Sequence, residues 1–165
     1  MTRRFAARMR LTRPHMTMNK KEQAVVDALG GLLADSYTLY LKTHSYHWNV
    51  TGPMFTTLHT LFETQYTELA LAVDEIAERI RALGAHAPGS YSEFIELAKV
   101  QEDTGVPKAT DMIKHLVKDH GLVVAAAERL IKAGEAAGDN ASVDMGVRRI
   151  ELHQKSAWML RSHLE

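Results

Sequence analysis

The chain has 165 residues, of which 45% are hydrophobic and 24% are charged, and this composition is typical of one globular domain with a sizeable core. The sequence contains no cysteine, which excludes disulfides, thiolate metal sites and cysteine nucleophiles and favours a reducing cytoplasm. No apolar run approaches the roughly 18 residues that a membrane-spanning helix needs. We therefore expect a cytoplasmic protein that does not enter a membrane.

The formal net charge of zero conceals an asymmetry along the chain. Residues 1–21 contain seven basic residues and no acid, which leaves 13 of the 20 basic residues and all 20 acidic residues for the remainder. Residues 1–16 show no helical period, and Arg13-Pro14 opposes helix formation. We predict a disordered basic arm over residues 1–16 and a folded domain over residues 17–165. The arginines of this arm are Arg3, Arg4, Arg8, Arg10 and Arg13.

Three interpretations of the basic arm stay open. It could bind the phosphate backbone of DNA without reading sequence. An arginine-rich segment without acids is also typical of an organelle presequence. Finally, translation could start at Met16 or Met18 rather than Met1, in which case the arm is not part of the protein.

Apolar residues recur at three- and four-residue spacing over four long segments, which predicts four amphipathic helices and no strand. We expect the helices at about residues 19–49, 54–83, 110–137 and 142–164, with Gly84 ending the second and Thr110-Asp111 capping the third. Gly30-Gly31 indicates close packing against another backbone, because glycine inside a helix otherwise costs about 1 kcal/mol.

A connection over residues 85–108 separates the second and third predicted helices, and Tyr91–Leu97 within it could form a short helix. A long crossover can join two parallel helices of one bundle. The sequence therefore predicts an all-α fold, a four-helix bundle with one long crossover that carries a short extra helix.

The second predicted helix carries a row of potential metal ligands. At about 100° per residue, His59, Glu63, Asp74 and Glu78 lie at roughly 0°, 40°, 60° and 100° around its axis. The ordinary interpretation is a packed histidine and a solvated acidic face. Against it, Asp74 and Glu78 lie within an apolar run, where an unpaired carboxylate is costly to bury.

The two ends of this row are too far apart for one ion. At about 1.5 Å rise per residue, His59 and Asp74 lie about 22 Å apart along the axis. Either the row forms two incomplete half-sites, or its ends meet across a symmetry axis, as an isologous dimer allows. We interpret it as a metal site between subunits, with His47, His59 and Glu63 of one chain facing Asp74 and Glu78 of the partner subunit.

The ligand types narrow the choice of ion. Imidazole and carboxylate without thiolate suit iron, manganese or zinc, and several carboxylates favour iron. A di-iron centre inside one bundle would need Glu-x-x-His pairs, and no glutamate in this chain has histidine at the third following position. The sequence thus favours an intersubunit centre.

The sequence around these ligands resembles the signature of the Dps proteins, the DNA-binding proteins of starved cells or mini-ferritins of the ferritin-like superfamily. The resemblance extends over about residues 19–165. The matching residues are His47-Trp48-Asn49-Val50-x-Gly52-x-x-Phe55-x-x-Leu58-His59-x-x-Phe62, then Tyr66 and Asp74-x-x-Ala77-Glu78-Arg79-Ile80.

The resemblance implies a dodecameric shell that oxidises Fe(II), with hydrogen peroxide preferred over dioxygen, stores ferric mineral inside and protects DNA from oxidative damage. It implies two iron ions per intersubunit site, for which zinc or manganese could substitute. It assigns His47, His59 and Glu63 to one subunit and Asp74 and Glu78 to its two-fold mate. The family often has aspartate at the position of Glu63.

The resemblance also implies roles for residues outside the row of potential metal ligands. Trp48 and Trp158 match aromatic positions near the family's iron centre, and we expect core packing rather than radical quenching from both. Asp144, with Asp139 and Glu135, would line acidic pores that attract iron at one kind of three-fold axis; an ordinary polar turn is the alternative. Twelve basic arms on one shell would add avidity for DNA at the nucleoid.

Two functional hypotheses follow. The first is an iron-sequestering ferroxidase, and the second is a DNA-compacting nucleoid protein whose intersubunit metal site is structural or occupied by zinc. Oxidation of Fe(II) beyond site occupancy distinguishes them. The other histidines are interpreted as surface or core residues, with His44 the one to test because it lies one turn from His47: His44, His86, His115, His120, His153 and His163.

Overall fold

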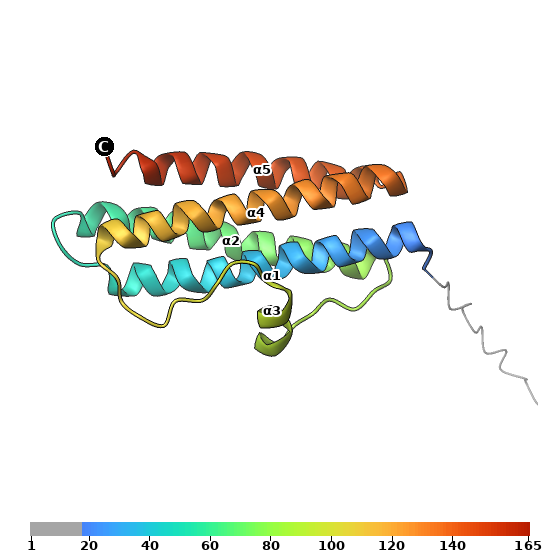
Figure 1. Ribbon diagram of the computed structural model, residues 1–165, viewed down its shortest axis with the longest axis horizontal. Coiled ribbons are helices and arrows are strands. Elements are labelled where there is room, and N and C mark those ends of the chain that lie inside the picture. Colours follow the sequence, from blue (N-terminus) through green and yellow to red (C-terminus); the bar gives the residue numbers. More distant parts are fainter. Residues whose placement is uncertain (1–17) are drawn as a thin grey trace, which may run out of the picture.

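The computed structural model describes residues 18–165, and all regular structure in this part of the chain is helical. Four long helices form a bundle, and a short fifth helix lies to one side of it (Figure 1). No helix in the described part is long and apolar enough to cross a bilayer. The predicted basic arm lies outside the described residues. The elements are α1 (Lys20–Asn49), α2 (Phe55–Ala82), α3 (Tyr91–Leu97), α4 (Ala109–Ala137) and α5 (Asn140–Arg161).

The connections decide how the bundle is arranged. Short turns join α1 to α2 and α4 to α5, so each of these pairs is antiparallel. The segment between α2 and α4 runs back along the bundle past α1 and carries α3, which makes α2 and α4 parallel (Figure 1). The helix α1 packs against α2, α3 and α4, and α4 packs against α5. The predicted four-helix bundle with one long crossover and a short extra helix is confirmed.

Local side-chain chemistry sets several helix ends. Asn19 accepts hydrogen bonds from the N–H groups of Lys21 and Glu22, and the Glu22 carboxylate accepts one from the Asn19 N–H, which is a capping box. Gly84 follows α2 in the left-handed region at a φ of 91°, as expected. The predicted cap of α4 by Thr110-Asp111 is wrong, because α4 begins at Ala109 after Lys108, whose side chain makes no capping bond.

The apolar faces of the four long helices meet in one core. Full burial of one leucine or phenylalanine side chain contributes about 1.5–3 kcal/mol, so this core is the main source of stability. Each long helix contributes buried side chains, among them Leu29, Leu33 and Leu39 of α1, Phe62, Leu69 and Ile76 of α2, Ile113, Leu116 and Leu130 of α4, and Met145 and Leu160 of α5.

Glycine allows a close helix contact, but not where we expected it. A Cβ added to Gly30 or Gly31 would meet no atom of the described chain within 4 Å, so the prediction of close backbone packing there is wrong for the single chain. The close contact lies between α4 and α5. A Cβ on Gly134 would lie 2.8 Å from Val143 Cγ2, and one on Gly146 would lie 2.7 Å from Ile131 Cγ1.

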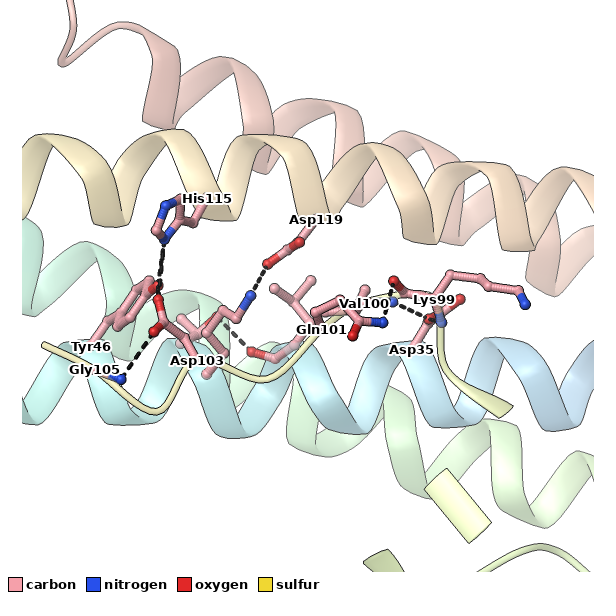
Figure 2. Close-up of polar contacts among 12 residues, drawn as sticks. Asp35, Tyr46, Lys99, Val100, Gln101, Asp103, Gly105, His115 and Asp119 are labelled. Carbon is pink, nitrogen blue, oxygen red and sulfur yellow. Dashed lines mark hydrogen bonds and ion pairs between the residues drawn. The ribbon is translucent and has the colours of Figure 1, made fainter. Parts of the chain in front are cut away.

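Buried polar side chains of α1 hold the crossover and α4 in place (Figure 2). Asp35 accepts the backbone N–H groups of Lys99 at 2.5 Å and Val100 at 2.8 Å. Burial raises the pKa of Asp35, and these two hydrogen bonds oppose the rise. Further along α1, the Lys42 ammonium pairs with the Asp119 carboxylate of α4 at 2.7 Å, with both side chains buried.

Replacement of Asp35 tests whether its two backbone hydrogen bonds hold the crossover against α1. Asp35→Ala leaves the Lys99 and Val100 N–H groups without an acceptor and should lower the free energy of unfolding by about 2–4 kcal/mol. Asp35→Asn keeps an acceptor oxygen and should cost less than the alanine variant. Urea denaturation of both variants measures the difference, and equal losses would contradict a role for the two backbone hydrogen bonds.

Candidate metal centre

Two histidines that the sequence singled out lie together where α1 ends and α2 begins. The rings of His47 and His59 stack with centroids 3.7 Å apart and planes 20° apart. Nδ1 of His47 lies 2.8 Å from the carbonyl oxygen of His59, and Nδ1 of His59 lies 2.9 Å from the carbonyl oxygen of His47. The two residues thus bond each other reciprocally through ring and backbone.

These two hydrogen bonds determine where the ring protons are. A carbonyl oxygen can only accept, so Nδ1 of both His47 and His59 carries a proton and donates. In the neutral rings Nε2 then keeps its lone pair free. A metal-binding histidine commonly donates its other ring N–H to a backbone carbonyl in this way, which orients the ring. Both rings thus have the tautomer and the fixed orientation that a metal-binding histidine needs.

Aromatic rings enclose the pair. Phe55 stacks on His59 at a centroid distance of 5.1 Å, and Tyr66 meets His47 edge-on at 5.2 Å. His44, the additional histidine that the sequence marked for testing, stacks on Tyr66 at 4.1 Å. Burial lowers the pKa of His44, and the neighbouring His47 lowers it further. His44 thus belongs to the wall around the pair.

The acidic residues of the row lie apart from the histidine pair. Glu63, Asp74 and Glu78 are all exposed on α2, the first about one turn beyond His59 and the other two towards the far end of the helix. Within residues 18–165, no three histidine or acidic side chains gather closely enough to hold a metal ion. The expectation that Asp74 and Glu78 are buried in an apolar stripe is wrong for the single chain, because both face outward.

The two tryptophans are not core residues of the subunit. Trp48 is 59% exposed and Trp158 is 60% exposed, so the expected core packing is wrong for the chain by itself. Trp48 follows His47 directly and packs on His44 at a ring distance of 4.2 Å. Large exposed aromatic side chains are typical of surfaces that another protein covers.

The residues predicted to line a pore lie around the turn between α4 and α5. Glu135 is exposed, whereas Asp139 caps α5 and pairs with Arg79 at 2.6 Å. Burial would raise the pKa of Asp139, but the hydrogen bonds from Arg79 and Ser142 lower it overall. Asp144 is exposed and bonds Arg148. The structure thus gives Asp139 a structural role within the chain, and the pore assignment stays a prediction.

A buried polar network in the bundle interior escaped the sequence-based prediction. His120 of α4 and His153 of α5 are both 2% exposed, and their Nδ1 atoms lie 2.8 Å apart. Arg149 donates to His153 Nε2 at 3.0 Å and to the Glu68 carboxylate at 2.9 Å. The apolar period could have revealed the burial of His120, because it lies four residues after the buried Leu116, but not its contact with His153.

The hydrogen-bond roles in this network follow from Arg149, which can only donate. His153 Nε2 must accept, so its proton lies on Nδ1, which donates to Nδ1 of His120. The proton of neutral His120 then lies on Nε2, a buried atom without a partner. Burial lowers the pKa of His120 to about 3, with a further contribution from Arg149, and burial likewise lowers that of His153.

Comparisons with known proteins agree with the helical bundle. A family model for the ferritin-like domain matches residues 26–165. A low temperature-induced protein of Nostoc is 41% identical over 89% of this chain and 83% of its own length. DNA protection during starvation protein 2 of Bacillus anthracis is 35% identical over 89% and 99% of the two chains. The crystal structure of the Dps protein of Vibrio cholerae is 31% identical, with a TM-score of 0.84 over 88% of this chain and 91% of that one.

The helical bundle and the matching family model therefore place the chain in the ferritin-like class. Within that class, the similarity to the starvation and Dps proteins extends over nearly the whole described chain. The chain belongs to the Dps family of mini-ferritins, as the motif around His47 and His59 indicated.

The buried histidines should make stability sensitive to acid. A folded-state pKa of about 3 for His120, against 6.5 ordinarily, means that its contribution is present above pH 6.5 and is lost as the pH falls below that value. Between pH 7 and pH 5 the free energy of unfolding should fall by about 1–2 kcal/mol for His120 alone. Urea denaturation across this range measures the slope.

Variants of the two buried histidines test whether this pH dependence comes from the His120–His153 network. His120→Gln combined with His153→Gln should flatten the pH dependence, whatever it does to stability at pH 7. His86→Gln, which replaces an exposed histidine, should leave the slope unchanged. A slope that survives the double substitution would place the acid sensitivity elsewhere.

Proposed function

We propose that the protein is an iron-sequestering ferroxidase that oxidises Fe(II), preferably with hydrogen peroxide, and stores the ferric mineral in a dodecameric shell. The observation that carries the proposal is the His47/His59 pair, whose two Nε2 atoms are free and whose two Nδ1 atoms are committed to backbone carbonyls. Membership of the Dps family supports it, and the Vibrio relative is described as one of the ferritin-like diiron-carboxylate proteins.

The geometry of α2 supports a site shared by two subunits. Two imidazoles are an incomplete ligand set, and the described chain supplies no third ligand beside them. Asp74 and Glu78 are exposed and form no ion pair in the described chain, so both carboxylates are free to bind a metal. In an antiparallel two-fold dimer, the acidic end of one α2 meets the histidine end of the other. Such a dimer would contain two identical sites.

Each residue of such a site would have its own role in iron binding and oxidation. His47 and His59 would bind Fe(II) as neutral ligands, and Glu63, which lies about one turn beyond His59, would have to turn towards the ion to join them. Asp74 and Glu78 of the partner subunit would add negative charge, which stabilises Fe(III) more than Fe(II) and so favours loss of an electron. If two ferrous ions each give one electron to one peroxide, the product is water and no hydroxyl radical is released. The protein would then limit oxidative damage as well as store iron.

The basic arm supports DNA binding as a second candidate function. Seven basic residues and no acid in residues 1–21 form a strongly cationic segment on an acidic body. Such a segment binds phosphate backbones without sequence preference. In a shell of twelve chains the arms would act together at the nucleoid of the cytoplasm. In this alternative the metal site would be structural or occupied by zinc.

Substitution of one residue in each half of the proposed site tests the ferroxidase activity. Anaerobic Fe(II) followed by limiting peroxide should give rapid ferric absorbance at two Fe(II) per peroxide. His59→Ala and Asp74→Asn should each slow it at least about tenfold, since even outer contacts of a metal site matter that much. Asp27→Asn, which replaces an exposed acid of α1, should match the unaltered protein. The proposal would be contradicted by oxidation no faster than in buffer. It would also be contradicted if oxidation stopped once the sites had each been filled with iron.

Mixing the two defective chains tests whether the site is shared. In a dimer of one His59→Ala chain and one Asp74→Asn chain, one site receives both defects and the other receives none. Random coassembly should therefore restore about a quarter of the sites, since half of the dimers are mixed. Oxidation rates of the coexpressed protein measure this recovery. No recovery in confirmed mixed assemblies would exclude a site built from both chains.

Removal of residues 1–16 tests the DNA candidate. Binding of the full chain to duplex DNA should weaken steeply with salt, with a logarithmic slope of about 0.9 for each phosphate contact. The truncated chain should lose both the affinity and most of that slope. Replacing the five arginines of the arm by glutamine in the full-length chain is the matched control for length. Unchanged DNA binding in both variants would exclude the arm as the DNA-binding segment.

A further inference from the structure

A tyrosine, an aspartate and a histidine from three different elements bring their polar atoms together (Figure 2). The hydroxyl of Tyr46 in α1 donates to Oδ2 of Asp103 in the crossover at 2.6 Å. Nδ1 of His115 in α4 lies 2.9 Å from the same hydroxyl and 3.2 Å from the same carboxylate oxygen. Three atoms that can each bind a metal ion therefore form a triangle with sides of 2.6, 2.9 and 3.2 Å.

The dimensions of this triangle match one face of a metal coordination sphere. Around an octahedral ion with bonds of about 2.0–2.1 Å, two adjacent ligand atoms lie about 2.8–3.0 Å apart. The three measured separations lie on both sides of that range. An ion above the plane of the triangle would contact all three atoms while the helices and the crossover keep their places. Three protein ligands on one face, with the remaining positions open, are also the arrangement of many non-haem iron sites.

The surroundings hold these three side chains in position. Oδ1 of Asp103 accepts the backbone N–H of Gly105 at 3.1 Å, which leaves Oδ2 for the triangle. Tyr46 is only 1% exposed, so packing fixes the orientation of its ring. Support of this kind from outside the ligands is typical of metal sites in proteins. The side chain of His115 is 46% exposed, so its ring can exchange protons with solvent and carry its proton on Nε2 instead of Nδ1.

The triangle borders a cavity with room for further ligands of an ion. Asp103 and His115 both line this cavity, which has a volume of about 180 Å³ and lies between α1, the crossover and α4. Lys99, Glu102 and Lys118 line it as well, and all three are exposed. The cavity is therefore reached from solvent, and water molecules or a small chelating anion can enter beside the triangle.

We propose that Tyr46, Asp103 and His115 form a second metal site, which binds a hard trivalent ion such as Fe(III). A phenolate and a carboxylate are hard anionic ligands that lower the charge of Fe(III) from three to one, and imidazole also suits iron. On binding, the O–H bond of Tyr46 breaks, a bond from its oxygen to the ion forms, and one proton passes to solvent. The ring proton of His115 moves from Nδ1 to Nε2. No electron is transferred, so the site does not depend on the proposed ferroxidase function.

This second site shares no ligand with the candidate centre at His47 and His59. Consecutive residues of a helix point about 100° apart. Tyr46 therefore reaches the crossover and α4, whereas His47 reaches α2. All three ligands of the second site also come from one chain. It would bind its ion within the subunit and would not require the two-fold contact that the histidine pair needs.

Visible spectroscopy of the full-length, unaltered oligomer tests the proposal. Fe(III) is added as its nitrilotriacetate complex, and a phenolate bound to Fe(III) is recognised by a visible charge-transfer band. We expect this band to grow until each chain has bound one ion. Tyr46→Phe should lose the band, and Tyr66→Phe, which alters the tyrosine beside the histidine pair, should retain it. His115→Ala and Asp103→Asn should each weaken Fe(III) binding at least about tenfold, since even outer contacts of a metal site matter that much.

Further outcomes separate this site from the ferroxidase centre. His59→Ala should leave the band unchanged, and an intact band in a protein that fails to oxidise Fe(II) would contradict the ferroxidase alone. A band that is absent from the unaltered protein or persists in Tyr46→Phe would overturn the second site. If Tyr46→Phe does not assemble, the half-exposed His115 decides, because unchanged Fe(III) affinity in His115→Ala would equally overturn it. A purely structural triad would lower the unfolding temperature of the variants without a visible band in the unaltered protein.

Discussion

The reciprocal hydrogen bonds between His47 and His59 are the contact on which the candidate site depends. They join the last turn of α1 to the N-terminal part of α2 across a short connection. Each bond satisfies a backbone carbonyl and at the same time sets the tautomer of a ring. The same two hydrogen bonds therefore fix both the orientation of the two candidate ligands and the way in which the chain passes from α1 to α2.

The length of α2 imposes the second constraint. A helix of 28 residues is rigid and about 42 Å long, so groups at its two ends cannot converge within one chain. Histidines lie at one end and the free carboxylates Asp74 and Glu78 towards the other. The ligand set that we propose would therefore need a second α2 running in the opposite direction. In that arrangement a bundle without internal Glu-x-x-His pairs would supply imidazole and carboxylate to one ion once two subunits assemble.

The interior of the bundle shows where polar groups replace apolar packing. Asp35, Lys42 and Tyr46 all lie on α1, and each bonds the crossover or α4. Buried polar groups cost stability unless they are paired, and here the pairing specifies how the crossover lies along α1. The network around Arg149 acts similarly between α2, α4 and α5, and it leaves Nε2 of His120 without a partner. Burial lowers the pKa of both histidines of that network, so protonation of either ring opposes folding.

The sequence by itself determined the helices, the crossover and the ligand row. Helical period and turn residues are local signals, and the motif around His47 and His59 carries the family resemblance. Only the tertiary structure decided which side chains meet. The stacking of His47 on His59, the Tyr46–Asp103 hydrogen bond and the His120–His153 contact join residues far apart in the chain, and periodicity carries no information on such pairs. Exposure of Asp74 and Trp48 likewise depends on which helix face the other helices leave uncovered, because burial is a property of packing rather than of sequence position.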